Sequence, residues 1–104
     1  MGMVIGVQPQ RIAEYKRLHA QPWPEMDAAL TAANIRNYSI YLRDGILFAC
    51  FEYVGSDFDA DMRAMAADPE TQRWWALMEP MQEKWPSASP GEWWSNMTEV
   101  FHCD

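Results

Sequence analysis

Tyr15 and His19 lie four residues apart and are the first side chains in this sequence that could do chemistry together. On a helix this spacing places a phenol and an imidazole on one face, one turn apart. His19 is one of only two histidines, and imidazole is the side chain best suited to moving protons near neutral pH. Pro22 and Pro24 follow, and a proline interrupts a helix. The spacing therefore predicts a proton-transfer site at a broken helix.

A structural explanation fits the same spacing. Tyr15 and His19 also continue an apolar stripe with Ile12, Leu18 and Trp23, and a lone histidine at helical spacing is often part of a core. A core role and a catalytic role for this pair both remain open at this point.

The composition predicts one domain, residues 1–104, with an excess of large rings. Hydrophobic residues make up 49% of the chain and aromatic residues 13%, including six tryptophans. A core of this size cannot hide so many rings, so some should line a ligand pocket or a subunit interface.

The charge favours an uncharged substrate. A formal net charge of -7 argues against a nucleic-acid surface and against anionic membranes or phosphorylated substrates. Cys50 and Cys103 form no C-x-x-C motif and no disulfide framework, which is typical of a protein in the reducing cytoplasm. No apolar stretch approaches the ~20 residues that span a bilayer, so no membrane partner is expected.

The apolar periodicity predicts alternating strands and helices along the chain. Strands are expected at Met3–Val7, Ile35–Leu42, Ile46–Tyr53 and Met97–His102, and helices at Arg11–His19, Trp23–Ala33, Phe58–Ala67 and Thr71 to about Gln82, the last of them bent near Pro80. Asp44-Gly45 is a strong hairpin signal, and Ser56 or Asp57 should cap the third helix. Strict alternation in the second strand would place Ile35 on the face opposite to Tyr38. The Pro- and Ser-rich stretch from Trp85 to Ser95 is expected to be a loop.

The order strand, broken helix, strand, strand, helices, strand predicts an α+β fold of the ferredoxin-like type, with a four-stranded antiparallel sheet and helices on one face. The strand at 46–53 is so apolar that both of its faces should be covered. No further element is left to cover the second face, so we expect a homodimer that pairs through the sheets and encloses a barrel-like interior with a cavity in each half.

The motifs of several chemistries are absent. The histidines and cysteines lack the spacing of a metal site, the glycines form no phosphate-binding loop, and no serine or cysteine lies in a nucleophile elbow. What remains is His19 among aromatic side chains. Tyr15, Tyr38, Trp74 and Trp75 could offer ring faces and hydroxyls to a sugar. Because Trp74 and Trp75 would project about 100° apart on a helix, one could be core and the other could face a cavity.

Several segments resemble the L-rhamnose mutarotase family, in order and over nearly the whole chain. They are Glu14-Tyr15 followed by His19, Pro22-Trp23-Pro24-Glu25, Asn37-Tyr38-x-Ile40-Tyr41-Leu42, Gln72-Arg73-Trp74-Trp75 and Glu99-Val100-Phe101. The resemblance implies a homodimeric α/β barrel that interconverts the α and β anomers of L-rhamnose, or of a related 6-deoxy-hexose such as L-fucose, without a cofactor. It also implies that His19 is the proton donor and that Tyr15, Tyr38, Trp74 and Trp75 bind the sugar.

Two features depart from the family pattern and two other functions stay open. The loop with Trp93-Trp94 matches no family motif, and His102 stands where an aromatic residue is expected. If the loop closes over the cavity, the substrate preference would differ.

The alternatives to a mutarotase are a cofactorless or haem-linked monooxygenase of the dimeric α/β barrel type, and a non-catalytic module that binds a small ligand.

Overall fold

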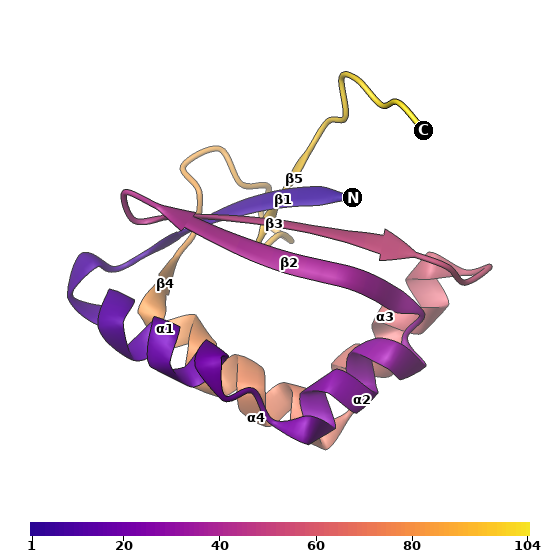
Figure 1. Cartoon of the computed structure of the whole chain (residues 1–104), viewed down its shortest axis with the longest axis horizontal. Coiled ribbons are helices and arrows are strands. Elements are labelled where there is room, and N and C mark those ends of the chain that lie inside the picture. Colours follow the sequence, from indigo (N-terminus) through magenta and orange to yellow (C-terminus); the bar gives the residue numbers. More distant parts are fainter.

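A sheet with all helices on one side makes up the computed structural model, which describes residues 1–104 (Figure 1). The strands are β1 (Gly2–Val7), β2 (Ile35–Arg43), β3 (Ile46–Tyr53), β4 (Gln82–Glu83) and β5 (Ser95–Met97). The helices are α1 (Ile12–Ala20), α2 (Pro24–Ala32), α3 (Phe58–Ala67) and α4 (Pro69–Met78), with short 3-10 turns at Pro9–Arg11 and Glu79–Met81. None of these helices is long and apolar enough to cross a membrane.

The strand order β2-β3-β1-β4 confirms the predicted ferredoxin-like fold class. All neighbouring strands run antiparallel. Both β4 and β5 pair with β1, since Val7 lies opposite Gln82 and Val4 lies opposite Ser95. Two short strands thus share the fourth position of the sheet, and residues 84–94 form an excursion between them.

The predicted last strand, Met97–His102, is wrong. Strand β5 ends at Met97, which pairs with Gly2 at the very start of β1. The chain therefore runs past the end of its only available neighbour, and residues 98–104 have no strand to pair with. They leave the sheet on the side away from the helices (Figure 1), with Val100 93% and Phe101 82% exposed.

The last helix also ends earlier than predicted. Helix α4 stops at Met78, and a 3-10 turn containing Pro80 leads directly into β4. Gln82 is therefore a strand residue and not a helix residue. Proline accounts for the change, because it supplies no N–H for the helical hydrogen-bond pattern.

A β-bulge in β2 corrects the predicted alternation. The pairing with β3 shifts between Arg36 and Ser39, and Asn37 adopts a positive φ of 51°, which asparagine tolerates better than most residues. One extra residue in the strand turns Ile35 to the same side as Tyr38, where both line one cavity. The bulge thus brings more apolar surface to the helix-covered face than strict alternation predicts.

Other local predictions are confirmed. Asp44 and Gly45 both have positive φ values, 52° and 75°, as a type I′ hairpin turn requires. The Asp57 carboxylate accepts a hydrogen bond from the Ala60 N–H and caps α3.

The core lies between the sheet and the helices. Its main cluster of buried residues consists of Ile5, Val7, Tyr15, Met26, Leu47, Trp74, Met78 and Met81. The opposite face of the sheet is only partly covered within one chain: Phe48 of β3 lies exposed there, whereas Val4 of β1, which pairs with Phe48, is buried. Only one face of β3 is therefore covered by this chain itself, although its sequence suits burial on both.

Candidate active site

A cavity of about 940 Å³ opens between the sheet and the helices. Of its 27 lining residues, 19 are hydrophobic, and residues from both ends of the chain contribute. All five of the residues predicted to form the site line it: Tyr15, His19, Tyr38, Trp74 and Trp75. The fold therefore brings together side chains that lie up to sixty positions apart in the sequence.

His19 lies in the last turn of α1, just before the predicted break. The ring nitrogen Nδ1 is 2.9 Å from the carbonyl oxygen of Tyr15. A carbonyl only accepts hydrogen bonds, so Nδ1 carries the hydrogen, and Nε2 keeps a free lone pair in the neutral ring. The ring is held on two sides, stacked on Tyr15 with centroids 4.2 Å apart and edge-on to Trp74 at 5.3 Å.

The environment of His19 favours the neutral imidazole. Partial burial lowers the pKa of His19 below its ordinary value of 6.5, and the hydrogen bond to the Tyr15 carbonyl offsets only part of this effect. At pH 7 the ring is therefore mainly uncharged, and Nε2 is ready to accept a proton.

Tyr15 lies both in the core and at the cavity. Its ring belongs to the main core cluster, with Ile12, Leu18 and Trp23 packed around that cluster, and it also lines the cavity. Its hydroxyl oxygen accepts a hydrogen bond of 3.2 Å from the side-chain amide of Gln82. Burial raises the pKa of the Tyr15 phenol, and the Gln82 bond opposes the change.

Tyr38 stands on the bulged strand β2 and packs flat against Phe51, with ring centroids 5.7 Å apart and planes 8° from parallel. Burial, and then the nearby Tyr15 phenol, raise the pKa of Tyr38 strongly. Both cavity tyrosines are therefore protonated at neutral pH, and each can donate a hydrogen bond from its hydroxyl.

The two adjacent tryptophans of α4 take different environments, as their angular separation predicts. Trp74 is 8% exposed and belongs to the core cluster, whereas Trp75 is 36% exposed at the cavity. Trp74 also packs edge-on to Trp23 at 5.0 Å, which ties α4 to the break between α1 and α2. Trp74 thus supports the site from behind, and Trp75 presents a more open ring face.

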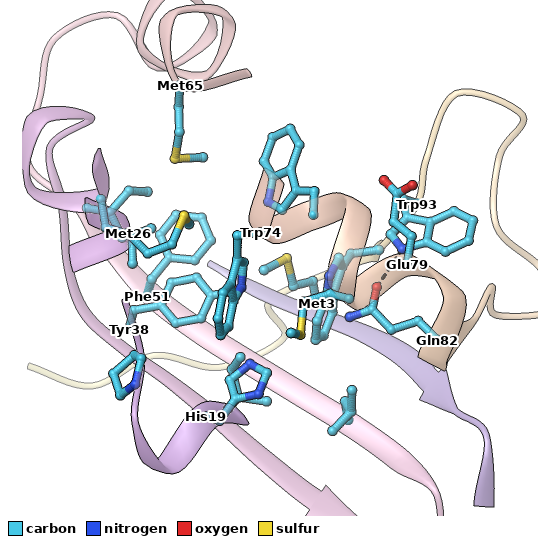
Figure 2. A pocket seen from close by; sticks show the side chains of 18 of the residues that line it. Met3, His19, Met26, Tyr38, Phe51, Met65, Trp74, Glu79, Gln82 and Trp93 are labelled. Carbon is cyan, nitrogen blue, oxygen red and sulfur yellow. Dashed lines mark hydrogen bonds between the residues drawn. The ribbon is translucent and has the colours of Figure 1, made fainter. Parts of the chain in front are cut away.

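Sequence reasoning missed Gln82 and left the position of Trp93 open. Figure 2 shows the Gln82 amide reaching toward the indole of Trp93, whose Nε1–H donates a hydrogen bond of 2.7 Å to Oε1 of Gln82. Both side chains line the cavity, so the 84–94 excursion forms part of its wall. The paired tryptophans indicated that the excursion would not be left fully in water. No local pattern indicated a role for Gln82, which the sequence predicts to be the last residue of a helix.

The second histidine lies elsewhere. His102 belongs to the exposed C-terminal tail, where its Nε2 contacts the Asp104 carboxylate at 2.7 Å, and it does not line the cavity. No group of three or more His, Cys, Asp or Glu side chains is placed to hold a metal ion. The cavity thus combines one neutral imidazole, two phenols and indole faces, and its lining also includes the charged residues Lys16, Asp27 and Glu79. These groups suit acid–base chemistry on a ligand with hydroxyl groups.

Comparisons with known proteins agree on one family. A sequence model described as L-rhamnose mutarotase matches residues 1–103. The L-rhamnose mutarotase of Oceanobacillus iheyensis is 34% identical, over 99% of this chain and 96% of that protein. The L-fucose mutarotase of Xanthomonas campestris is 37% identical, over 86% of this chain and 74% of that protein. A crystal structure of an L-rhamnose mutarotase from Formosa agariphila has the same fold, with a TM-score of 0.76 at 21% identity, covering 99% of this chain and 96% of that one.

Proposed function

Because the chain belongs to the L-rhamnose mutarotase family, we propose that it interconverts the α and β anomers of L-rhamnose, with L-fucose or another 6-deoxy-hexose as the next candidate substrate. The observation that carries the proposal is the His19 imidazole, whose Nε2 is left free inside a cavity that is mostly apolar. We place the activity in residues 1–104 acting as one domain. Two free, exposed cysteines support a location in the reducing cytoplasm.

In the proposed reaction His19 handles both proton transfers. Neutral Nε2 takes the proton from the anomeric hydroxyl of the sugar, and the bond from C1 to the ring oxygen breaks as the aldehyde forms. The protonated imidazole of His19 then gives this proton to the former ring oxygen of the sugar, which has become an alkoxide. Both oxygens are bonded to C1, so one nitrogen can serve both. The aldehyde rotates about its bond to C2, and the same steps in reverse close the ring as the other anomer.

The aromatic residues hold the sugar in this proposal. The hydroxyls of Tyr15 and Tyr38 donate hydrogen bonds to sugar oxygens, since burial keeps both phenols protonated. The open ring face of Trp75 packs against the C–H bonds of the sugar, and Trp74 holds the His19 ring in place from its edge. The apolar lining favours the methyl group of a 6-deoxy sugar over a hydroxymethyl group, because a buried hydroxyl without a partner is unfavourable.

Exchange NMR of the anomeric protons tests this function. The protein should accelerate exchange for L-rhamnose, and it should do so about 10–100-fold less efficiently for L-mannose, which differs only by the hydroxyl on C6. L-Fucose, which keeps the methyl group but differs in ring stereochemistry, separates the two proposed substrates. Unchanged exchange for all three sugars would refute the proposal, and sugar binding without exchange would indicate a binding module instead.

We further propose that two copies pair through the uncovered face of the sheet. The register of the strands places Tyr41 and Phe48 opposite each other on that face, and Phe48 lies opposite Val4 in turn. Tyr41, Phe48 and Met97 are all exposed large side chains. The C-terminal tail, with exposed Val100 and Phe101, leaves the sheet on this same side (Figure 1). A second copy of the chain would bury all of these apolar groups at once.

The substitution Phe48→Glu should raise the dissociation constant of this dimer by at least about 100-fold, because the twofold axis brings two desolvated carboxylates into one interface. Sedimentation equilibrium measures the effect. Val54→Glu is the matched control, since Val54 is also exposed but lies beyond the end of β3, and it should leave the dimer intact. A wild-type protein that sediments as a monomer at micromolar concentration would contradict the proposed dimer.

A further inference from the structure

Gln82 is a buried polar side chain in contact with the cavity, and it is 7% exposed. Its backbone is fixed by pairing of β4 with β1, where Gln82 lies opposite Val7. Its side chain makes two hydrogen bonds, one to the Tyr15 hydroxyl at 3.2 Å and one to the Trp93 indole at 2.7 Å. Gln82 therefore joins helix α1 to the 84–94 excursion through a single amide.

The chemistry of the two partners fixes which way the amide points. An indole N–H can only donate, so the carbonyl oxygen of Gln82 must face Trp93. The NH₂ group must then face Tyr15, and the phenol oxygen must accept from it. The direction of the hydrogen bond between Gln82 and Tyr15 therefore follows from the donor and acceptor types of the partners alone.

This direction decides what the Tyr15 hydroxyl can do. Its oxygen already accepts a hydrogen bond from Gln82, so its own proton is free to point elsewhere. Tyr15 stacks on His19 and both line the cavity, so a sugar that reaches His19 lies within reach of this hydroxyl.

We infer that Gln82, oriented by Trp93, is a positioning residue that keeps the Tyr15 hydroxyl turned toward the cavity as a hydrogen-bond donor to the sugar. The inference rests on the proposed function, since it assigns Tyr15 a bond to the sugar. It also gives the 84–94 excursion a role, because the indole of Trp93 selects the orientation of the amide.

Gln82→Glu tests the direction of the bond with almost no change in shape. The introduced carboxylate still accepts from Trp93, but it cannot donate to Tyr15, so the phenol must turn its proton toward the carboxylate. The KM for L-rhamnose should rise about tenfold or more, with a smaller change in kcat. Gln82→Met removes both hydrogen bonds and leaves the phenol free to turn, so its KM should rise only about threefold. Because a buried carboxylate can also destabilise the fold, urea denaturation of both variants separates the two explanations, and a purely structural role predicts that the rise in KM follows the loss of stability.

Gln10→Glu is the matched control, since Gln10 is exposed and its only side-chain bond is to Gln8. It adds the same charge and should leave KM and kcat unchanged. A KM within twofold of wild type in Gln82→Glu, or a larger rise in Gln82→Met than in Gln82→Glu, would overturn the inference. Trp93→Phe keeps an aromatic ring, although a smaller one, but removes the N–H, and should raise KM about threefold even if the Gln82 variants do not fold.

A titration without sugar separates this inference from the proposed function. The hydrogen bond from Gln82 lowers the pKa of Tyr15, so removing it should raise that pKa in Gln82→Met, and the added negative charge should raise it further in Gln82→Glu. The carbon-13 signal of the Tyr15 ring carbon that bears oxygen reports the titration. An unchanged Tyr15 pKa refutes the bond even in an active enzyme. Absent sugar exchange with a raised pKa refutes the function while leaving the geometry standing.

Discussion

His19→Ala should lower the rate of L-rhamnose anomer exchange about 10²–10⁴-fold, which is the usual contribution of one general acid or base. The expected loss follows from the free Nε2, which no other imidazole in the cavity can replace. Because His19 is only half-buried, the variant should stay folded. Exchange NMR measures the loss, and near-ultraviolet circular dichroism checks that the aromatic packing is kept.

His102→Ala serves as the control, since His102 is the only other histidine and lies in the exposed tail. It should exchange anomers at the wild-type rate. Loss of exchange in His102→Ala, together with a rate within about threefold of wild type in His19→Ala, would show that the proton carrier has been misassigned.

The pH profile of the wild-type rate should follow His19 as well. Burial lowers the pKa of His19, so the neutral base is present above that pKa and is lost as the pH falls through it. The acid limb of the exchange rate should therefore have its midpoint below pH 6.5. In His102→Ala the single remaining imidazole signal belongs to His19, and its NMR titration should give the same midpoint.

Trp74→Ala should lower the free energy of unfolding by about 3–5 kcal/mol, the range for truncating a large aromatic side chain in a core. Trp74 is packed among His19, Trp23 and the buried cluster beneath the sheet, so its loss leaves a cavity that these neighbours cannot fill. Urea denaturation measures the change. Exchange activity should fall too, because the edge contact that holds the His19 ring is lost.

Trp75→Ala is the matched comparison from the next position of the same helix. Trp75 is the more exposed ring, so the variant should lose about 1 kcal/mol of stability or less. Its KM for L-rhamnose should rise about tenfold, with less change in kcat, because a platform for the sugar is lost and the proton carrier is not. Equal destabilisation by both variants would contradict the assignment of Trp74 to the core and Trp75 to the ligand.

Much of the fold follows from local patterns in the chain. The helical and strand periodicities, the Asp44-Gly45 turn and the Asp57 cap act over a few residues, so they can be recognised from sequence, and together they specify the strand order. The resemblance to one family pointed to five candidate site residues, and every one of them lines the cavity. The pair Tyr15 and His19 needed only one helical turn to come into contact.

Tertiary structure decided what depends on partners far away in the chain. The tail after Met97 alternates like a strand, but Met97 already pairs with Gly2, the first residue of β1, so the tail has no further residues of β1 to pair with. No local pattern in the tail reveals how long the neighbouring strand is. The bulge at Asn37 depends on pairing with β3. Gln82 gains its place only because β4 pairs with β1, which brings its amide to Tyr15, 67 positions earlier, and to Trp93, 11 positions later. Local propensity selects the elements, whereas the direction of a buried hydrogen bond is set by which donor and which acceptor the packing brings together.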